Sequence, residues 1–514
     1  MVSFPNREDS IKRPVEGLSR CKGAKVASSI SASKRSGNAS CEVRGGRSTD
    51  DGKDSITLSE ERVLAAHKTV QDGGELHSAV SMHGGTRIRR LEPFLDSLYQ
   101  CAKADRQRVF HSLHDKLCSM EILEEAWRRV ASNNGVAGID SETIGDIRNA
   151  GAEQYLSTLQ QELIDETYTV ECVRRVYIPK PNGKQRPLGI PTVRDRIVQQ
   201  AVKLLIEPIF EADFQEFSYG YRPNKSAQQA SQEVYKYLNY GLTNIIDIDI
   251  EDFFGTIDHD RLISFVMERI SDPYIIKLIR EWLRAGVVYN GETTYPDMGT
   301  PQGGVISPLL ANIYLNKLDS AWKGRKMDSK YRHDAHLIRY ADDMCVLTDK
   351  EPSKAMAVIA ELTDSLGLRL SPEKTRITTA QQGFDFLGFH FVRAWNDRRN
   401  KDVTYVYPSV KSVRKFRDKV RDIIPLTKSH VKSEEQVVRE LNLLITGWSN
   451  YFNHSNASRA YNSLDRYIAW KAAKFYCKVH KIRLVSSRKN TLRKMHAKGL
   501  KRLSGRIRYV SRTA

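Results

Sequence analysis

Apolar residues recur along this chain with two different periods. Helical spacing appears first in four apolar residues that share one face of a helix: Leu91, Phe94, Leu95 and Leu98. A second helix is predicted over residues 120–127, ending before a Ser-Asn-Asn-Gly segment. From residue 176 to about residue 392, short β-rich runs alternate with helices, and beyond about residue 403 the pattern is helical. The sequence therefore predicts an α/β region followed by a helical one.

Two adjacent acids interrupt the β-rich region. Asp342 and Asp343 follow Tyr340 and Ala341 between two apolar runs, which is typical of a β-hairpin with an acidic tip. Burying paired like charges is costly unless a cation compensates them. The tip is therefore either a solvated turn, the commoner case for such a motif alone, or a site for Mg²⁺.

A second acidic segment, residues 244–254, begins as a strand. Its alternation places Asp247 and Asp249 on one face, opposite the isoleucines. A strand that ends in acids beside an acidic hairpin offers ligands for two Mg²⁺ ions about 4 Å apart, an arrangement suited to nucleotidyl transfer. A solvated strand end explains Asp247, Glu251 and Asp252 equally well.

The loop between the two acidic segments has features of a phosphate-binding turn. Gly303 and Gly304 would let the backbone approach a substrate closely. Ser307 is a candidate N-cap, and Pro308 suits the first position of the following helix. A glycine-rich turn before a helix is a weak signal by itself.

Residues 177–191 read as a basic hairpin. A Pro-Asn-Gly turn joins its two strands. Lys180, Lys184 and Arg186 are its cations. An exposed basic turn and a clamp for a triphosphate fit this pattern equally well.

The composition predicts a polyanionic partner. The chain has 514 residues, 40% of them hydrophobic, and a formal charge of +19. No apolar run approaches the roughly 18 residues that span a bilayer, which argues against a membrane partner. Residues 1–85 are rich in Ser, Gly, Lys and Arg and predict a disordered extension. No acid follows Asp465, so the C-terminal region is expected to bind a polyanion.

The cysteines and the N-terminus indicate a cytoplasmic protein. Seven scattered cysteines form no CxxC pair, which argues against a disulfide framework and a zinc module. The N-terminus has no apolar signal core. The acid-poor segment 11–47 leaves an organelle presequence as the alternative, against which its weak amphipathicity argues.

In chain order, these segments resemble the reverse transcriptase/maturase family encoded by group II introns. The resemblance covers about residues 91–483 and is carried by ordered blocks at residues 177–190, 192–196, 217–223, 249–259, 299–312, 340–343, 368–375 and 383–389. It implies a multidomain α/β protein, a right-hand polymerase of fingers and palm with an α-helical thumb/maturase domain. With the disordered extension first and a basic DNA-binding-like tail last, the implied domains are residues 1–85, 86–395, 396–480 and 481–514.

The resemblance also implies roles for the acids. It assigns Asp249, Asp342 and Asp343 as catalytic carboxylates. Asp249, Asp342 and the backbone carbonyl of Ile250 would hold two Mg²⁺ ions, for which Mn²⁺ can substitute. The chain departs from the family in having Glu251-Asp252 where Lys-Gly is common, which adds negative charge beside the metals.

The same resemblance implies a nucleotide site. Phe254 matches the steric gate that excludes a ribose 2′-OH. Lys180 and Arg186 match the residues that grip the incoming triphosphate. Gln302 lies where the family contacts the incoming nucleotide and the primer-template.

A segment near the C-terminus, residues 438–452, resembles the maturase motif of this family, whose thumb helices bind intron RNA. Its apolar residues recur on one helical face and are expected in the core: Leu441, Leu444, Ile445 and Trp448. The phosphate contacts are predicted instead on cations of the preceding helix: Lys411, Arg414, Lys415, Arg417, Lys419 and Arg421.

We therefore expect an RNA-directed DNA polymerase that also assists splicing, in the bacterial cytoplasm or nucleoid. Its expected partners are group II intron RNA, target DNA, a template-primer duplex and dNTPs, with no membrane. No His-Asn-His endonuclease is expected, since the cysteine pairs typical of that domain are missing and only about 60 residues follow Phe452. Two alternatives are a splicing cofactor that keeps the polymerase fold as an RNA platform and a host-adopted or defence-associated reverse transcriptase.

Overall fold

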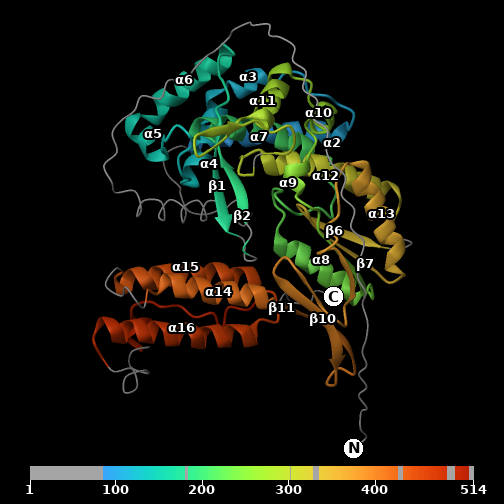
Figure 1. Ribbon diagram of the computed structural model, residues 1–514, viewed down its shortest axis with the longest axis vertical. Helices are drawn as coiled ribbons and strands as arrows, with labels where there is room; N and C mark the ends of the chain where they lie inside the picture. The colour runs from blue at the N-terminus through green and yellow to red at the C-terminus, as the bar shows by residue number, and fades with distance from the viewer. Residues whose placement is uncertain are drawn as a thin grey trace, which may run out of the picture. The chain divides into compact units, whose positions relative to one another are not determined.

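The structure is a computed structural model (Figure 1). It describes residues 85–179, 183, 185–300, 302–327, 335–425, 432–482 and 493–508. All of these belong to one compact unit, Asp54–Ala514. The extension predicted to be disordered lies outside the described residues up to residue 84.

The N-terminal helices surround one central helix. These elements are α2 (Gly85–Ala104), α3 (His114–Leu117), α4 (Met120–Ser132), α5 (Ile144–Ala150), α6 (Ala152–Ile164) and α7 (Val193–Glu211). Helix α7 is buried around most of its circumference, as expected of a helix enclosed by others, and packs against α2, α3 and α4. The two helices predicted from apolar spacing are α2 and α4, and α4 ends at Ser132, one residue later than predicted.

The first sheet has the strand order β2-β1-β4-β5. Its strands are β1 (Val173–Pro179), β2 (Gln185–Ile190), β4 (Val287–Tyr289) and β5 (Glu292–Thr294). β1 and β2 are antiparallel, which confirms the predicted basic hairpin. The turn residues Lys180, Pro181, Asn182 and Lys184 lie outside the described residues.

The second sheet is antiparallel and has the order β6-β7-β3-β8. Its strands are β3 (Asn244–Ile248), β6 (His336–Tyr340), β7 (Asp343–Thr348) and β8 (Arg376–Thr379). Because side chains alternate along a strand, Ile246 and Ile248 enter one hydrophobic core while Ile245 enters another. The helices before and between these strands are α8 (Ala227–Asn239), α9 (Phe253–Thr256), α10 (His259–Met267), α11 (Pro273–Arg284), α12 (Ser307–Gly324) and α13 (Pro352–Ser365).

The third sheet, β11-β10-β9, leads into the C-terminal helices. These elements are β9 (Phe384–Phe386), β10 (Phe389–Asn396), β11 (Lys401–Pro408), α14 (Val410–Ile423), α15 (Glu434–Phe452) and α16 (Ser458–Val479). The helical pattern predicted from about residue 403 was wrong by several residues, because β11 pairs with β10 along its whole length. α14 contacts both α15 and α16 (Figure 1).

The apolar face predicted on α15 lies in the second core. Leu441 and Ile445 are fully buried, and Leu444 and Trp448 pack against them in part. Three residues after α16 join the same core: Met495, Leu500 and Leu503. Part of the predicted basic tail is therefore packed on these helices. Among the described residues, no helix combines the length and hydrophobicity needed to cross a membrane.

Candidate active site

The predicted acidic hairpin is formed by β6 and β7. Tyr340 pairs with Asp343, so the turn between the strands consists of Ala341 and Asp342. Ala341 has φ +56°, a left-handed conformation that is unfavourable for a residue with a side chain. We refer to β6, this turn and β7 as the acidic hairpin.

Asp249 lies beside the acidic hairpin. Ile248 pairs with Met344, so the next residue of the antiparallel register, Asp249, lies opposite Asp343. The backbone of Asp249 is fixed by a hydrogen bond from Ser371 N to its carbonyl, at 2.8 Å. The structure therefore brings the three predicted carboxylates together from segments about ninety residues apart.

The acids carry excess negative charge. Burial raises the pKa of Asp342, and the neighbouring Asp249 raises it further. Asp343 is exposed at the start of β7, but protein packed around its carboxyl, together with repulsion from Asp342 and Asp249, raises its pKa to about 7. Such groups favour a cation that would compensate them.

One of these acids is paired with a lysine. Lys374 Nζ lies 2.6 Å from Asp249 Oδ1 and 2.8 Å from Oδ2. Within the described ranges, no three side chains among His, Cys, Asp and Glu are arranged as a complete metal site. The donor set still fits a hard divalent ion, since carboxylate oxygens are its preferred ligands and their charge exceeds that of nearby cations.

A cavity of about 140 Å³ lies next to these acids. Arg186, Phe254 and Gln302 line it together, as does Tyr221. Arg186 lowers the pKa of Asp342, and Asp342 in turn contributes to the raised pKa of Tyr221, whose main cause is burial, so the cavity and the acids are electrostatic neighbours. Lys180, the other predicted triphosphate contact, lies outside the described residues.

The loop that carries Gln302 is attached to β2. Arg186 Nε donates to Gln302 Oε1 at 3.2 Å, and Gly189 N donates to the Gln302 carbonyl at 2.7 Å. Gly303 has φ +122°, and a Cβ there would collide with the carbonyl of Gly189. The close approach predicted for this glycine is therefore to the β2 backbone.

Ser307 is not the N-cap predicted for the next helix. α12 begins at Ser307 itself, and Ile306 takes the cap position with no side-chain cap. Instead, Gln199 Oε1 on α7 accepts from Val305 N at 2.9 Å, so a distant side chain binds the backbone just before the helix. Pro308 is the second residue of α12, one position after the predicted one, and still lies in the first turn, where proline is tolerated.

Sequence reasoning missed a buried ion pair behind the acidic hairpin. Arg339 and Asp319 are both fully buried, and Arg339 Nε donates to the two Asp319 oxygens at 2.9 and 3.0 Å. Arg339 Nη1 also donates at 3.0 Å to Asn312 Oδ1 and to the carbonyl of Ala341. This arginine thus holds the turn itself. The available signal was a lone arginine in the apolar run that precedes Asp342 and Asp343.

Asn312 links the turn to a third segment. Its Nδ2 donates to the carbonyl of Gly220 at 2.8 Å. A Cβ on Gly220 would collide with the backbone of Ala341, so only glycine allows this approach. The segment around Gly220 therefore supports the turn from outside the sheet.

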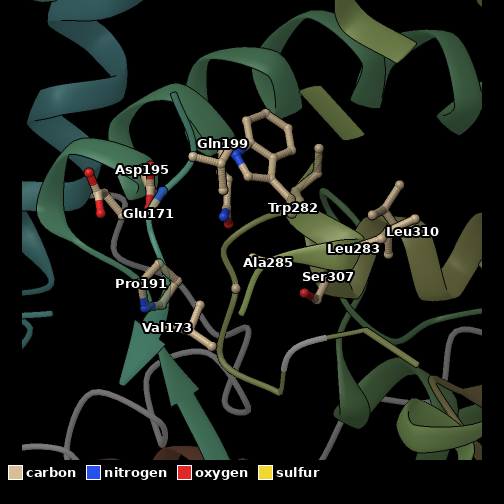
Figure 2. Close-up of a pocket in the computed structure, with 13 residues that line it drawn as sticks. Glu171, Val173, Pro191, Asp195, Gln199, Trp282, Leu283, Ala285, Ser307 and Leu310 are labelled. Atoms are coloured by element: carbon tan, nitrogen blue, oxygen red, sulfur yellow. The ribbon is translucent and has the colours of Figure 1, made fainter. Parts of the chain in front are cut away.

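A second buried acid lies behind the loop of Gln302. Asp195 accepts from Tyr168 Oη at 2.6 Å and from Glu171 N at 3.3 Å, and burial raises its pKa to about 6. Figure 2 shows side chains from α7, α11 and α12 converging on a small cavity here, of about 10 Å³. Trp282 Nε1 is buried nearby without a hydrogen-bond partner in the described part of the chain. A space of this size has room for about one water molecule.

The predicted phosphate contacts all lie on α14 and all are exposed: Lys411, Arg414, Lys415, Arg417, Lys419 and Arg421. Arg417 Nη2 donates to Ser463 Oγ on α16 at 3.1 Å, and Arg421 forms an ion pair with Asp418. Their exposure leaves them available to an external polyanion.

Comparisons with known proteins identify two family matches. Residues 178–391 match the model described as reverse transcriptase (RNA-dependent DNA polymerase), which implies a right-hand polymerase fold. Residues 413–495 match the model described as the group II intron maturase-specific domain. The mixed helices and strands of the described region agree with this assignment.

Three curated relatives align with the chain. Protein YkfC of Escherichia coli (strain K12) is 36% identical over 308 residues, 53% of this chain and 81% of that protein. The group II intron-encoded protein LtrA of Lactococcus lactis subsp. cremoris is 35% identical over 226 residues, 44% of this chain and 37% of LtrA. An uncharacterized 91 kDa protein in the cob intron of Schizosaccharomyces pombe is 27% identical over 412 residues, 66% of this chain and 50% of that protein. The chain belongs to the reverse transcriptase/maturase family of group II introns and is by class an RNA-directed DNA polymerase.

Proposed function

We propose that this protein copies RNA into DNA for a group II intron and also binds the intron RNA to assist splicing. Members of its family act on intron RNA and on DNA, and reverse transcriptases use divalent metal ions. The observation that carries the proposal is the meeting of Asp249, Asp342 and Asp343 beside the cavity lined by Arg186 and Phe254.

In this proposal the acids serve nucleotidyl transfer. Asp249, Asp342 and the carbonyl of Ile250 would hold two Mg²⁺ ions, or Mn²⁺ in their place. The bound metals supply activation of the primer 3′-hydroxyl and neutralisation of the leaving pyrophosphate. Asp343 adds negative charge next to these ligands, since its carboxyl lies close enough to Asp342 and Asp249 for electrostatic repulsion from both.

The cavity residues select and orient the dNTP. Arg186 and Lys180 grip the triphosphate, where the planar guanidinium offers paired hydrogen bonds. Phe254 excludes the 2′-OH of a ribonucleotide. Gln302, fixed to Arg186 and to the β2 backbone, contacts the nucleotide and the primer-template.

The domain division that we propose is the one implied by the sequence: fingers and palm over 86–395, thumb/maturase domain over 396–480 and a basic DNA-binding-like tail over 481–514. The exposed cations of α14 bind the template-primer duplex and intron RNA. Reverse transcription at the target DNA, primed by intron-mediated cleavage or by a replication fork, supports mobility.

Extension of a DNA primer on an RNA template tests the catalytic proposal. Asp342→Asn removes one negative charge from the site with little change in volume. We expect cDNA synthesis to be lost while RNA affinity stays within about twofold. Asp364→Asn, an exposed aspartate on α13, is the matched control and keeps wild-type synthesis. Normal extension by Asp342→Asn contradicts the assignment, and a wild-type protein that binds RNA without extending any primer supports the RNA-platform alternative.

Incorporation of ribonucleotides tests the role of Phe254. We expect Phe254→Ala to accept rNTPs much more readily, because the ring no longer fills the space of a 2′-OH. Phe254→Tyr keeps the ring and keeps the selectivity. Equal sugar selectivity in wild type and Phe254→Ala rules out the steric gate.

A further inference from the structure

Helix α16 carries aromatic and cationic side chains on one face. Tyr467, Trp470, Lys471 and Lys474 are spaced as i, i+3, i+4 and i+7, so they lie in a row along the helix. All four are partly exposed. The ammonium of Lys474 lies 4.1 Å from the Trp470 ring centre, and that of Lys471 lies 5.3 Å from it and 5.9 Å from Tyr467.

Helix α14 adds two cations to this row. The guanidinium of Arg417 lies 5.7 Å from the Tyr467 ring centre and is also anchored to Ser463 on α16. Burial lowers the pKa of Lys471, and Arg421 and Lys474 lower it further, so Arg421 is an electrostatic neighbour of α16. We call Arg417, Arg421, Tyr467, Trp470, Lys471 and Lys474 the aromatic–cation face.

Acids of these helices balance little of this charge. Asp418 forms an ion pair with Arg421. Asp465 accepts backbone hydrogen bonds from Leu503 and Ser504, at 2.8 and 2.9 Å, and so serves the C-terminal segment. Asp422 lies about 100° around α14 from Arg421. Cations held this close together favour a polyanion.

Trp470 differs from the core aromatics of the same helices, whereas Tyr467 packs in part against the core and keeps some exposed surface. Tyr461 is fully buried and donates to the Ser449 carbonyl at 3.0 Å, and Trp448 packs against Phe416, 5.0 Å between ring centres. Trp470 is not part of that core, and its ring contacts are with Tyr467 and two lysines. A phosphate groove for duplex needs only the cations. Exposed rings between cations suit unpaired bases, which can stack on them.

We propose that the aromatic–cation face binds an unpaired segment of RNA, with bases stacked on Tyr467 and Trp470 and phosphates on the four cations. The proposal deepens the proposed function: if the partner is the intron, the segment is a loop or bulge of its RNA. A paired RNA helix would use the cations alone.

Equilibrium binding by the full-length protein tests this assignment without any catalysis. The probes are a 12-nucleotide single-stranded RNA and a blunt 16-base-pair RNA duplex, each measured by fluorescence anisotropy in the absence of dNTPs. We expect the double variant Tyr467→Ala/Trp470→Ala to bind the single strand about tenfold or more weakly, and the duplex within about twofold of wild type. Trp395→Ala, which removes another exposed tryptophan, 58% exposed on β10, is the matched control and changes neither affinity.

The cations give a separate readout. Lys471→Gln/Lys474→Gln should reduce the slope of log affinity against log salt for the single strand by about 1.4. The aromatic variant should leave this slope unchanged. If the aromatic variant matches Trp395→Ala, or loses single-strand and duplex binding equally, the stacking assignment is wrong.

Stacking is also measurable in the unmodified protein, so the test survives if the double variant fails to fold. A 2-aminopurine placed in the single-stranded probe should lose fluorescence on binding wild type, and lose less on binding Trp470→Ala. Unchanged fluorescence on binding overturns the proposal. Because these measurements need no dNTP or metal, they can fail while primer extension succeeds, and primer extension can fail while they succeed.

Discussion

One set of acids contacts Arg339 and another follows it on the acidic hairpin, and the two sets differ in how their charge is balanced. Asp319 is fully buried, and Arg339 satisfies both its oxygens inside the protein. Asp342 and Asp343 lie beside each other and beside Asp249, and their raised pKa values report unbalanced charge. Asp319 is a matched acid, because a cation of the fold balances its charge, and such an acid stabilises the structure. Asp249, Asp342 and Asp343 are unmatched acids, which depend on a cation from outside the protein.

The largest expected effect comes from the unmatched set. Asp343→Asn should reduce the rate of primer extension by about 10³-fold or more, because several kcal/mol of transition-state stabilisation depend on these charges. Its melting temperature without metal should equal or exceed that of wild type, since a disfavoured charge is removed. Single-turnover extension and thermal unfolding in EDTA measure the two effects. A variant that keeps its rate and loses stability would make Asp343 a structural acid.

The matched set should behave in the opposite way. Asp319→Ala should lower the free energy of unfolding by about 3–5 kcal/mol, because it leaves the buried guanidinium of Arg339 with an unmatched charge. Urea unfolding measures this change. The control is Arg280→Ala, which breaks an exposed ion pair with Asp260 and should cost about 0–1 kcal/mol.

A double-mutant cycle sharpens this result. If Arg339 and Asp319 act as a pair, replacing both with apolar residues should cost much less than the sum of the single replacements. Additive costs would show that each residue acts through other contacts, such as the bond from Arg339 to the Ala341 carbonyl.

Asp195 is a further buried acid, and the pH dependence of stability tests how its charge is balanced. The folded-state pKa of Asp195 is about 6, above its ordinary 3.8, so the stability due to its protonated form is present below about pH 4 and is lost as pH rises through 6. The unfolding free energy of wild type relative to Asp195→Asn should therefore fall by about 2–3 kcal/mol between pH 4 and 7.5. Urea unfolding at several pH values measures this difference. A flat difference for Asp195→Asn would mean that Asp195 is already charged in the fold at pH 4.

The sequence allowed the unmatched acids to be found but not the matched ones. Asp342 and Asp343 interrupt two apolar runs, and Asp249 ends an alternating strand, so local pattern marks them as candidates, and the ordered blocks of the family resemblance then select them. Asp319 lies mid-helix, where an aspartate is usually solvated, and its partner is on a strand twenty residues later. Ser307 misled for the same reason: the backbone just before α12 is bound by Gln199, a side chain 106 residues from Val305. Pairings between residues far apart in the chain do not appear in the periodic pattern of apolar and polar residues.

The smallest expected effect concerns the cation that lies on Asp249. Lys374 contacts both Asp249 oxygens from an exposed position, so a divalent ion must displace an exposed ion pair, which is typically worth less than about 1 kcal/mol. Lys374→Gln should therefore bind Mn²⁺ up to about fivefold more tightly, as measured by electron paramagnetic resonance titration of the metal-free protein. Arg376→Gln is the matched control. It removes the positive charge that is paired with Asp247, two residues before Asp249, and leaves Lys374 in contact with Asp249. If both variants gain the same Mn²⁺ affinity, the effect of Lys374 comes from the net charge of the region and not from its contact with Asp249. If Lys374→Gln binds Mn²⁺ more weakly than wild type, the lysine positions the acids for the metal.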